Sequence, residues 1–302
     1  MITNFNELEH FVLSKNIKKK IALANAHDEP ALSALVHAKR KGVAEGLLVG
    51  KKDEIVKLLH EMGENEADYE ILDMDAPEQD VANKTIQLVK AGEADIPMKG
   101  LLQTSNYARA VLNREFGLLP ASGKRLISQC GVFEFEGRLM MITDAAINIA
   151  PDVNTLCGIV ENILPLAKVL GNDCPKVAVL SAVEKLNPKM PSTELAAEVV
   201  KHGVEGCLIS GPLALDGAIS MESVKHKGIV NDPVAGQADI LLVPYIEVGN
   251  VLYKAITYFA GKTMASSVCG GYHPVIITSR SDTPENKYYS ILLAVLRSAL
   301  GE

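Results

Sequence analysis

Ser279 and Arg280 have the residue types and the position in the sequence that best suit chemistry. They follow an apolar, β-branched run at 275–278, and Pro284 then begins an apolar-periodic segment that continues to the C-terminus. This pattern predicts a buried parallel strand followed by a helix. Unpaired N–H groups at the helix N-terminus, together with a guanidinium and a hydroxyl, suit a phosphate or a carboxylate. The alternative is that Arg280 pairs with a carboxylate and only fixes the loop.

Further polar turns follow other predicted strands. Ligands bind at the carboxyl ends of strands in open α/β sheets, so these turns contain the remaining candidate residues. For each turn taken alone, the simpler interpretation is that its Gly and Pro are ordinary turn residues. The turns are Lys99-Gly100, Asp144 through Asn148, Ser210-Gly211-Pro212 with Asp216, and Pro244 through Lys254. Arg109 lies on the helix after the first turn, and Lys254 follows Asn250 at a spacing that puts both on one helix face.

The turns belong to an alternating order of strands and helices. The first half predicts strands at 21–25, 46–50, 69–73 and 95–99, with helices at 29–41, 52–62, 77–90 and 104–113. An antiparallel hairpin is predicted over 128–143. The alternation then resumes with strands at 176–180, 207–210, 238–243 and 265–268 and helices at 154–170, 192–202 and 249–259. The alternation in the first half predicts a parallel sheet with helices on both faces, and the whole order fits two α/β lobes joined near 145–152.

Composition narrows the class of protein. The chain has 302 residues, 48% of them hydrophobic and 22% charged, which is typical of a globular protein. A net charge of −7 argues against a nucleic-acid partner or an anionic membrane surface. No apolar run reaches the roughly 20 residues of a membrane span, and no leader pattern is present. The five scattered cysteines resemble reduced thiols, so a cytoplasmic location is expected.

Several common motifs are missing from the sequence. Neither G-x-G-x-x-G after the first strand nor G-x-x-x-x-G-K-[ST] is found, which disfavours a Rossmann dinucleotide site and a P-loop. There is no G-x-S-x-G elbow, and the seven histidines include no zinc spacing. A bound metal is therefore not expected.

With these residues in view, the chain resembles the phosphate acetyl/butyryltransferase family, and its butyryl branch in particular, over nearly its whole length. Each matching segment is weak alone, but the ordered set is specific. The segments are Asp95-Ile-Pro-Met-Lys-Gly100 with Arg109-Ala-Val-Leu-Asn113, Ile142-Thr-Asp-Ala-Ala-Ile-Asn148, Asn187-Pro-Lys-Met190, Gly211-Pro-Leu-Ala-Leu-Asp-Gly-Ala218, Val234 through Pro244, Gly249-Asn-Val-Leu-Tyr-Lys254 and Thr278 through Lys287.

The resemblance implies a two-domain α/β fold related to the isocitrate/isopropylmalate dehydrogenases, each domain with three layers. The expected first domain comprises 1–146 and 284–302, the second comprises 147–283, and the active site lies in the cleft between them. The implied reaction is acyl-CoA plus phosphate giving acyl phosphate plus coenzyme A, a substrate pair that needs no bound cofactor. A homodimer or larger homo-oligomer is expected.

The resemblance also implies roles for individual residues. Ser279 and Arg280 bind the phosphoryl group, and Arg109 assists them. The acetyl branch has a base, an aspartate, seven residues after the serine, and here that position is Asn286. Glu285 is the expected substitute; Asp282, or no carboxylate at all, remains open. Lys99, Asp144, Asn148, Asp216, Asn250 and Lys254 are expected to contact the substrates.

The turn that includes Met190 is of the butyryl type, so we expect a longer, more apolar acyl pocket in which Met190 or Leu186 forms a wall. Ordinary core packing is the alternative for either residue.

Two other functions compete with the transferase: a non-catalytic sensor of acyl phosphate or coenzyme A, and a nicotinamide-dependent hydroxy acid dehydrogenase. The dehydrogenase would need a set of metal-binding aspartates with a Tyr/Lys pair, which the sequence lacks.

Overall fold

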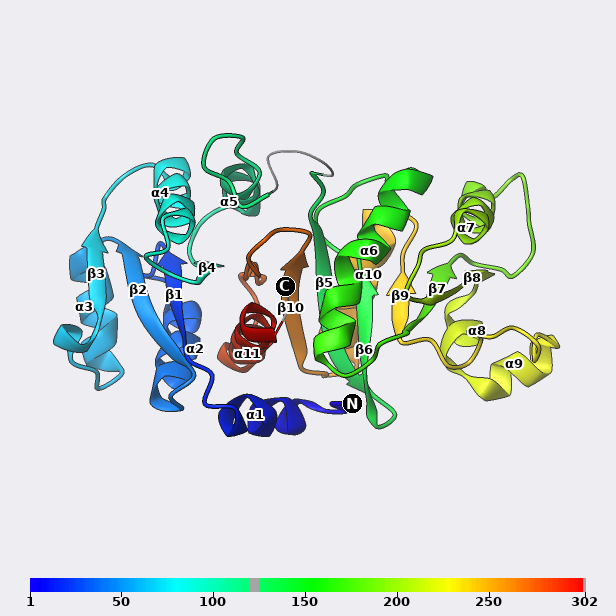
Figure 1. Ribbon diagram of the computed structural model, residues 1–302, viewed down its shortest axis with the longest axis horizontal. Coiled ribbons are helices and arrows are strands. Elements are labelled where there is room, and N and C mark those ends of the chain that lie inside the picture. Colours follow the sequence, from blue (N-terminus) through cyan, green and yellow to red (C-terminus); the bar gives the residue numbers. More distant parts are fainter. Residues whose placement is uncertain (120–124, 301–302) are drawn as a thin grey trace. The chain divides into compact units, whose positions relative to one another are not determined.

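The computed structural model describes residues 1–119 and 125–300 and divides into two compact units, which are described separately (Figure 1). Unit 1 comprises 1–4 and 126–264, and unit 2 comprises 5–125 and 265–302. These boundaries differ from the predicted ones at 146/147 and 283/284. The hairpin belongs to unit 1 because its second strand pairs with a strand of that unit. Residues 275–278 belong to unit 2 because they hydrogen-bond to a strand of its sheet.

Unit 2 is built on a parallel four-stranded sheet in the order β3-β2-β1-β4. The strands are β1 (Lys19–Ala24), β2 (Ala44–Gly50), β3 (Glu70–Asp73) and β4 (Ile96–Lys99). All three pairings are parallel, as predicted. The apolar residues of β1 and β4 are fully buried because helices cover both faces of the sheet.

The connections of unit 2 place its helices in two layers. They are α2 (Glu29–Arg40), α3 (Lys52–Glu61), the 3₁₀ turn η1 (Glu66–Asp68), α4 (Glu78–Lys90) and α5 (Thr104–Val111). The chain moves outward from β1 to β3 and then returns across the sheet to β4. Right-handed crossovers therefore put α4 on the face opposite α2 and α3. The sheet thus has a topological switch point between β1 and β4, where ligands bind in folds of this class.

The helices at the chain ends complete these layers. The terminal helix α11 (Pro284–Leu300) packs against α2 and against α1 (Phe5–Ser14), while α4 packs against α5. The sequence did not predict α1. No helix in the two described stretches is long and apolar enough to cross a membrane.

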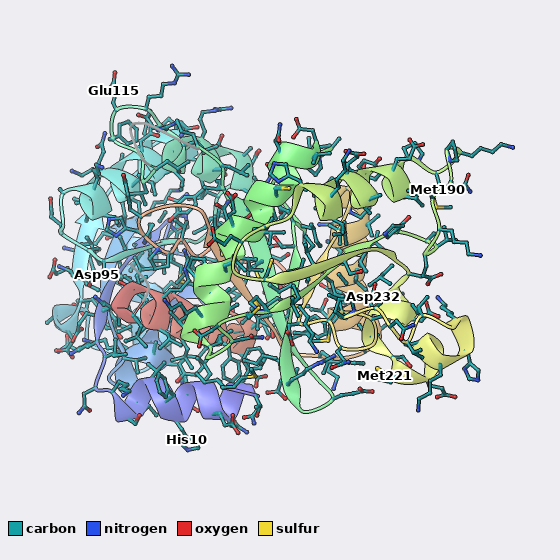
Figure 2. The ribbon with its side chains drawn as sticks, turned by 45° about the vertical axis from the view of Figure 1, so that its right-hand side comes forward. His10, Asp95, Glu115, Met190, Met221 and Asp232 are labelled. Carbon is teal, nitrogen blue, oxygen red and sulfur yellow. The ribbon has the colours of Figure 1, made fainter. Side chains whose placement is uncertain are left out.

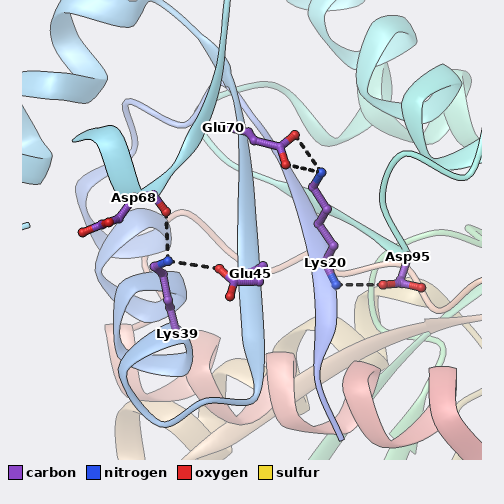
Figure 3. Close-up of polar contacts among 6 residues, drawn as sticks. All are labelled: Lys20, Lys39, Glu45, Asp68, Glu70 and Asp95. Atoms are coloured by element: carbon purple, nitrogen blue, oxygen red, sulfur yellow. Dashed lines mark hydrogen bonds and ion pairs between the residues drawn. The ribbon is translucent and has the colours of Figure 1, made fainter. Parts of the chain in front are cut away.

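Ion pairs occupy the amino ends of the strands of unit 2 (Figure 3). The Lys20 ammonium lies 2.6 and 2.7 Å from the two Glu70 carboxylate oxygens, and its backbone N–H donates to Asp95 over 2.7 Å. Lys39 donates to the Glu45 carboxylate over 3.0 Å and to the Asp68 carbonyl over 2.9 Å. These lysines are neutralised by carboxylates within the fold, in contrast to the basic groups at the opposite, carboxyl end of the sheet.

Unit 1 is a second α/β unit on a mixed sheet. Five strands of this sheet lie in the unit, in the order β5-β6-β9-β7-β8. They are β5 (Ser128–Phe135), β6 (Arg138–Thr143), β7 (Lys176–Leu180), β8 (Leu208–Leu213) and β9 (Ile240–Leu242). The β5–β6 pair is antiparallel, which confirms the predicted hairpin, and β6, β9, β7 and β8 pair in parallel.

The helices of unit 1 are α6 (Val153–Val169), α7 (Pro191–His202), α8 (Leu215–Ile219), α9 (Met221–Lys227) and α10 (Ile246–Lys254), which continues into the π-helical turn η2 (Ala255–Phe259). Helices α8 and α9 were not predicted, because their short segments contain too few turns for a clear period. From β10 (Met264–Cys269) the chain passes into unit 2.

Candidate functional site

The Lys99-Gly100 turn lies at the switch point of the sheet of unit 2. The Gly100 N–H donates to the Ala24 carbonyl at the end of β1 over 2.9 Å, and the Asn25 side-chain amide donates to the Leu101 carbonyl over 2.9 Å. A Cβ atom on Gly100 would lie 2.5 Å from the carbonyl oxygens of Ala24 and Asn25. The turn is therefore drawn tightly across the end of β1, which requires a glycine.

This close approach gives a prediction for Gly100→Ala. The added methyl would collide with two backbone oxygens rather than with a flexible side chain, so the turn has to move. We expect the free energy of unfolding to fall by about 1–3 kcal/mol, the usual cost of overpacking. Urea denaturation measures the change. Gly46→Ala is the control for adding a methyl group, because a Cβ there would meet only side-chain atoms, at 3.3–3.4 Å, and its φ is not positive. An equal loss in both variants would contradict the steric explanation.

The segment that leads to Ser279 runs beside β4. The Lys99 N–H donates to the Ile276 carbonyl over 2.9 Å, and the Ile276 N–H donates to the Pro97 carbonyl over 3.0 Å. These are parallel contacts, as predicted, but they form an isolated bridge between Met98 and Ile276 rather than a regular strand. The turn after Ile276 and the turn after Lys99 leave the sheet at the same edge.

Two buried side chains hold the Ser279 backbone from opposite sides. The Asp282 carboxylate accepts a hydrogen bond from the Ser279 N–H over 2.7 Å. The Lys287 ammonium donates to the Ser279 carbonyl and to the Thr278 hydroxyl, each over 2.9 Å. Asp282 and Lys287 are 7% and 1% exposed. The conformation of this turn is therefore fixed by the protein before any ligand binds.

The functional groups of the turn itself face outward. Arg280 is exposed, and the Ser279 hydroxyl lies 3.0 Å from that of Ser281. Asp282, the open alternative as base, is occupied by the Ser279 N–H. An exposed guanidinium beside fixed hydroxyls can bind an anion with little rearrangement.

Lys99 is a buried cation next to this turn. Its side chain is 3% exposed, and its ammonium donates to the Gly100 carbonyl over 3.2 Å and to the Leu102 carbonyl over 3.1 Å. Burial and the neighbouring charges of Lys287 and Arg280 lower the pKa of Lys99 to about 8. Three basic groups are thus gathered at the carboxyl end of β4, which makes this edge attractive to an anion.

Arg109 is directed toward α4. Its guanidinium donates to the Gln79 side-chain oxygen over 3.0 Å, and the residue is exposed on α5. Helix α5 is tied to α4 through Glu78 of α4, which accepts hydrogen bonds from the N–H of Gln103, the N-cap of α5, and from the Asn106 amide. Arg109 therefore comes from a neighbouring helix, and its part in the site stays a prediction.

Glu285 and Lys287 lie on different faces of α11. Glu285, in the first turn, lines a hollow of about 360 Å³ with Glu9 of α1, His37 of α2 and Tyr289 of α11. Lys287 faces the turn that contains Ser279. The direction of Glu285 gives no support to its expected role as base, which stays a prediction. Asn286, where the acetyl branch has a carboxylate, is 8% exposed.

In unit 1, the Asp144–Asn148 loop is organised by one carboxylate. Asp144 is 2% exposed and accepts hydrogen bonds from the N–H groups of Ala146, Ile147 and Asn148 and from the Asn148 amide. Burial raises the pKa of the Asp144 carboxyl group, and these hydrogen bonds oppose that shift. Asn148 also donates to the Ile127 carbonyl. The Asp144 carboxylate is engaged by its own loop.

The predicted residues of α10 lie near this loop. The Asn250 amide donates to the Ala145 carbonyl over 3.3 Å, and a Cβ atom on Gly249 would lie 2.5 Å from the Asp144 carbonyl oxygen. Lys254 is exposed one turn further along α10. The structure therefore brings Asp144, Asn148 and Asn250 together, and their contact with a substrate stays a prediction.

Two other predicted residues of unit 1 lie elsewhere. Asp216 is paired with Lys227 over 2.6 Å, and the hydrogen bond from Lys227 lowers the pKa of Asp216. Met190 precedes α7 at the end of β7, where its sulfur lies 3.6 Å from the Ser181 hydroxyl (Figure 2). Leu186 is 64% exposed, so it is not part of a core.

The site contains residues that the sequence interpretation did not select. Lys287 was not selected as a site residue, although its position on the buried face of the helix after Pro284 is a signal for it. Asp28, the N-cap of α2, acts electrostatically on both Lys99 and Lys287. Among residues 1–119 and 125–300, no cluster of His, Cys, Asp and Glu is arranged to hold a metal ion.

Comparison with known proteins gives matches over nearly the whole chain. The family model described as Phosphate acetyl/butaryl transferase matches residues 67–295. A phosphate butyryltransferase of Clostridium acetobutylicum is 44% identical over 302 residues, 98% of each chain. A phosphate acetyltransferase of Thermotoga maritima is 36% identical and covers 92% of this chain and 95% of its own. The crystal structure of a branched-chain phosphotransacylase from Enterococcus faecalis has a TM-score of 0.81 at 34% identity, covering 92% and 98% of the two chains.

Proposed function

Because the chain belongs to the phosphate acetyl/butyryltransferase family and is an acyltransferase, we propose that it catalyses short-chain acyl-CoA plus phosphate giving acyl phosphate plus coenzyme A. Butyryl-CoA is the proposed substrate, since the relatives at 42–44% identity are named phosphate butyryltransferases. The acyl group passes directly between the two bound substrates, and coenzyme A is a substrate rather than a resident cofactor.

The observation that supports this reaction is the basic edge of the sheet of unit 2. Arg280 is exposed there beside the Ser279 hydroxyl, and the buried ammonium groups of Lys99 and Lys287 lie behind the turn. Inorganic phosphate carries nearly two negative charges at neutral pH. A forked guanidinium and fixed donors can hold its non-reacting oxygens while one oxygen faces the thioester carbonyl.

The site would accelerate the reaction mainly by holding the reactants. Two substrates bound in contact react as if in one molecule, which removes much of the entropic barrier. Attack on the thioester also makes a tetrahedral oxyanion, and Arg280 is the donor that we propose for it. The fixed backbone at Ser279 keeps these donors in place, so little reorganisation is needed as charge develops.

The finer features of the family description are also proposals for this chain. We propose a fold related to the isocitrate/isopropylmalate dehydrogenases, a cytoplasmic location, and a homodimer or larger homo-oligomer. Met190 is the proposed contact for the acyl chain, because its thioether lies at the carboxyl end of β7 and adapts to several chain lengths. We propose substrate-contacting roles for Asn250 and Lys254 on the same helix face of α10, and for Asp216.

The function is tested by measuring release of free coenzyme A from acetyl-, butyryl- and octanoyl-CoA, with and without phosphate. We expect release that depends on phosphate and is fastest with butyryl-CoA, with acyl phosphate as the second product. Faster release from acetyl-CoA would show that acetyl-CoA, rather than butyryl-CoA, is the preferred substrate. If phosphate accelerates release from none of the three, the chain is not an acyltransferase on these substrates, and calorimetric binding of butyryl phosphate would then identify a sensor.

A further inference from the structure

The reaction needs a group that exchanges a proton with coenzyme A, and position 286 offers no carboxylate. We propose that the side-chain amine of Lys99 is this group, taking the thiol proton when coenzyme A attacks and returning it when coenzyme A leaves. This inference rests on the proposed function and adds a catalytic residue to it. The geometry that supports it is the position of Lys99 at the carboxyl end of β4, beside the segment that ends in Ser279 and Arg280.

The hydrogen bonds of Lys99 suit an amine that changes its protonation state. Its nitrogen donates to two carbonyl oxygens, those of Gly100 and Leu102. A neutral amine has two N–H donors and one lone pair, so both carbonyls stay satisfied after the proton is lost. The remaining tetrahedral position then holds either the third hydrogen or the lone pair. Lys99 can therefore gain and lose a proton without leaving a buried carbonyl unpaired.

The surroundings of Lys99 favour exchange near neutral pH. Lys287 on α11 and Arg280 in the turn disfavour its charged form, while Asp28 before α2 and Glu78 on α4 favour it. Burial is the largest effect, and together these lower the pKa of Lys99 to about 8. A free thiol has a pKa near ~8.5, and proton transfer is most effective between groups of similar pKa. Burial also lowers the pKa of the other buried lysine, Lys287, while Asp28 and Asp282 favour its charged form.

The proposed step balances in both directions. When coenzyme A attacks an acyl phosphate, its thiol proton moves to the neutral Lys99 amine and the S–C bond forms. The C–O bond to phosphate then breaks, and the ammonium gives its proton to the leaving phosphate oxygen. In the opposite direction, hydrogen phosphate gives its proton to the amine as its oxygen attacks. The C–S bond then breaks, and the ammonium protonates the leaving thiolate. One amine thus takes a proton from one substrate and gives it to the other.

The test measures formation of butyryl-CoA from butyryl phosphate and coenzyme A between about pH 6 and about pH 10, a range that spans the two ionisations. The variants are Lys99→Met, Lys99→Arg and Lys287→Met. Lys90→Met, at an exposed position of α4, is the matched surface control. We expect Lys99→Met and Lys99→Arg to lose about a hundredfold in kcat/KM, within the usual range for a general base. Circular dichroism establishes that each variant is folded.

The pH dependence of kcat/KM in Lys287→Met distinguishes a catalytic role of Lys99 from a purely structural one. Removing that positive charge removes one cause of the lowered pKa of Lys99, so the acidic limb of the kcat/KM profile should move to higher pH. The thiol of free coenzyme A cannot shift in this way. Lys99→Arg retaining activity within about threefold, or a limb that stays in place in Lys287→Met, would overturn the assignment. Absence of turnover in the wild-type protein would instead reject the proposed function.

Discussion

Arg280→Ala is expected to lower kcat/KM for phosphate about a hundredfold, which corresponds to a loss of about 2.7 kcal/mol of transition-state stabilisation. Arg280 is an exposed cation on a turn whose backbone is fixed by two buried side chains. Its guanidinium can be directed at the phosphate without first being withdrawn from a buried network. Removing it should therefore weaken phosphate binding and oxyanion stabilisation while leaving the fold intact.

The measurement is phosphate-dependent release of coenzyme A from butyryl-CoA, with saturation in each substrate. Arg114→Ala, at another exposed arginine of unit 2, is the matched control and should change kcat/KM less than about twofold. Arg109→Ala should give an intermediate loss if that side chain leaves Gln79 to reach the substrate. If Arg280→Ala keeps its activity, the proposed reaction stands, but phosphate binds at another part of the chain.

The sequence predicted most of the helices and strands, though not α1, α8 or α9, and it selected the two turns that lie at the carboxyl end of β4. Short apolar runs alternating with helical patterns predicted the sheet of unit 2, and the rule that ligands bind at strand ends selected both Lys99-Gly100 and Ser279-Arg280. The hydrogen bonds between Lys99 and Ile276 place these two turns at one edge. Local pattern was enough here because parallel strands with right-handed crossovers leave few alternative arrangements.

Side-chain roles could not be predicted in the same way. Lys287 is the last residue of the matching segment Thr278–Lys287, yet only the packed helix shows that its ammonium reaches the Ser279 carbonyl. The lowered pKa of Lys99 depends on burial and on the charges of Lys287 and Arg280, which are far from it in the sequence. Glu285 was chosen because it adjoins position 286. Neighbouring residues on a helix point about 100° apart, however, and Glu285 lines the hollow beside α1 and α2.

Asp144→Ala is expected to lower the free energy of unfolding of unit 1 by about 2–4 kcal/mol, because it removes the acceptor for several loop N–H groups at once. The carboxylate accepts hydrogen bonds from three successive backbone N–H groups and from the Asn148 amide. These groups have the Asp144 oxygens as a common partner, so water would have to enter the loop to replace them. Helix α10 contacts this loop through Asn250 and Gly249, so the loss should extend to that helix.

Urea denaturation followed by far-ultraviolet circular dichroism measures the change. Asp152→Ala is the matched control, since Asp152 is the exposed N-cap of α6 and, within the described residues, accepts hydrogen bonds from one other residue, Thr155. Its cost should be about 1 kcal/mol. Asp144→Asn keeps one acceptor oxygen and should fall between the two. If Asp144→Ala is no less stable than Asp152→Ala and yet loses activity, the carboxylate does not organise the loop and serves the substrate directly, as the family resemblance first implied.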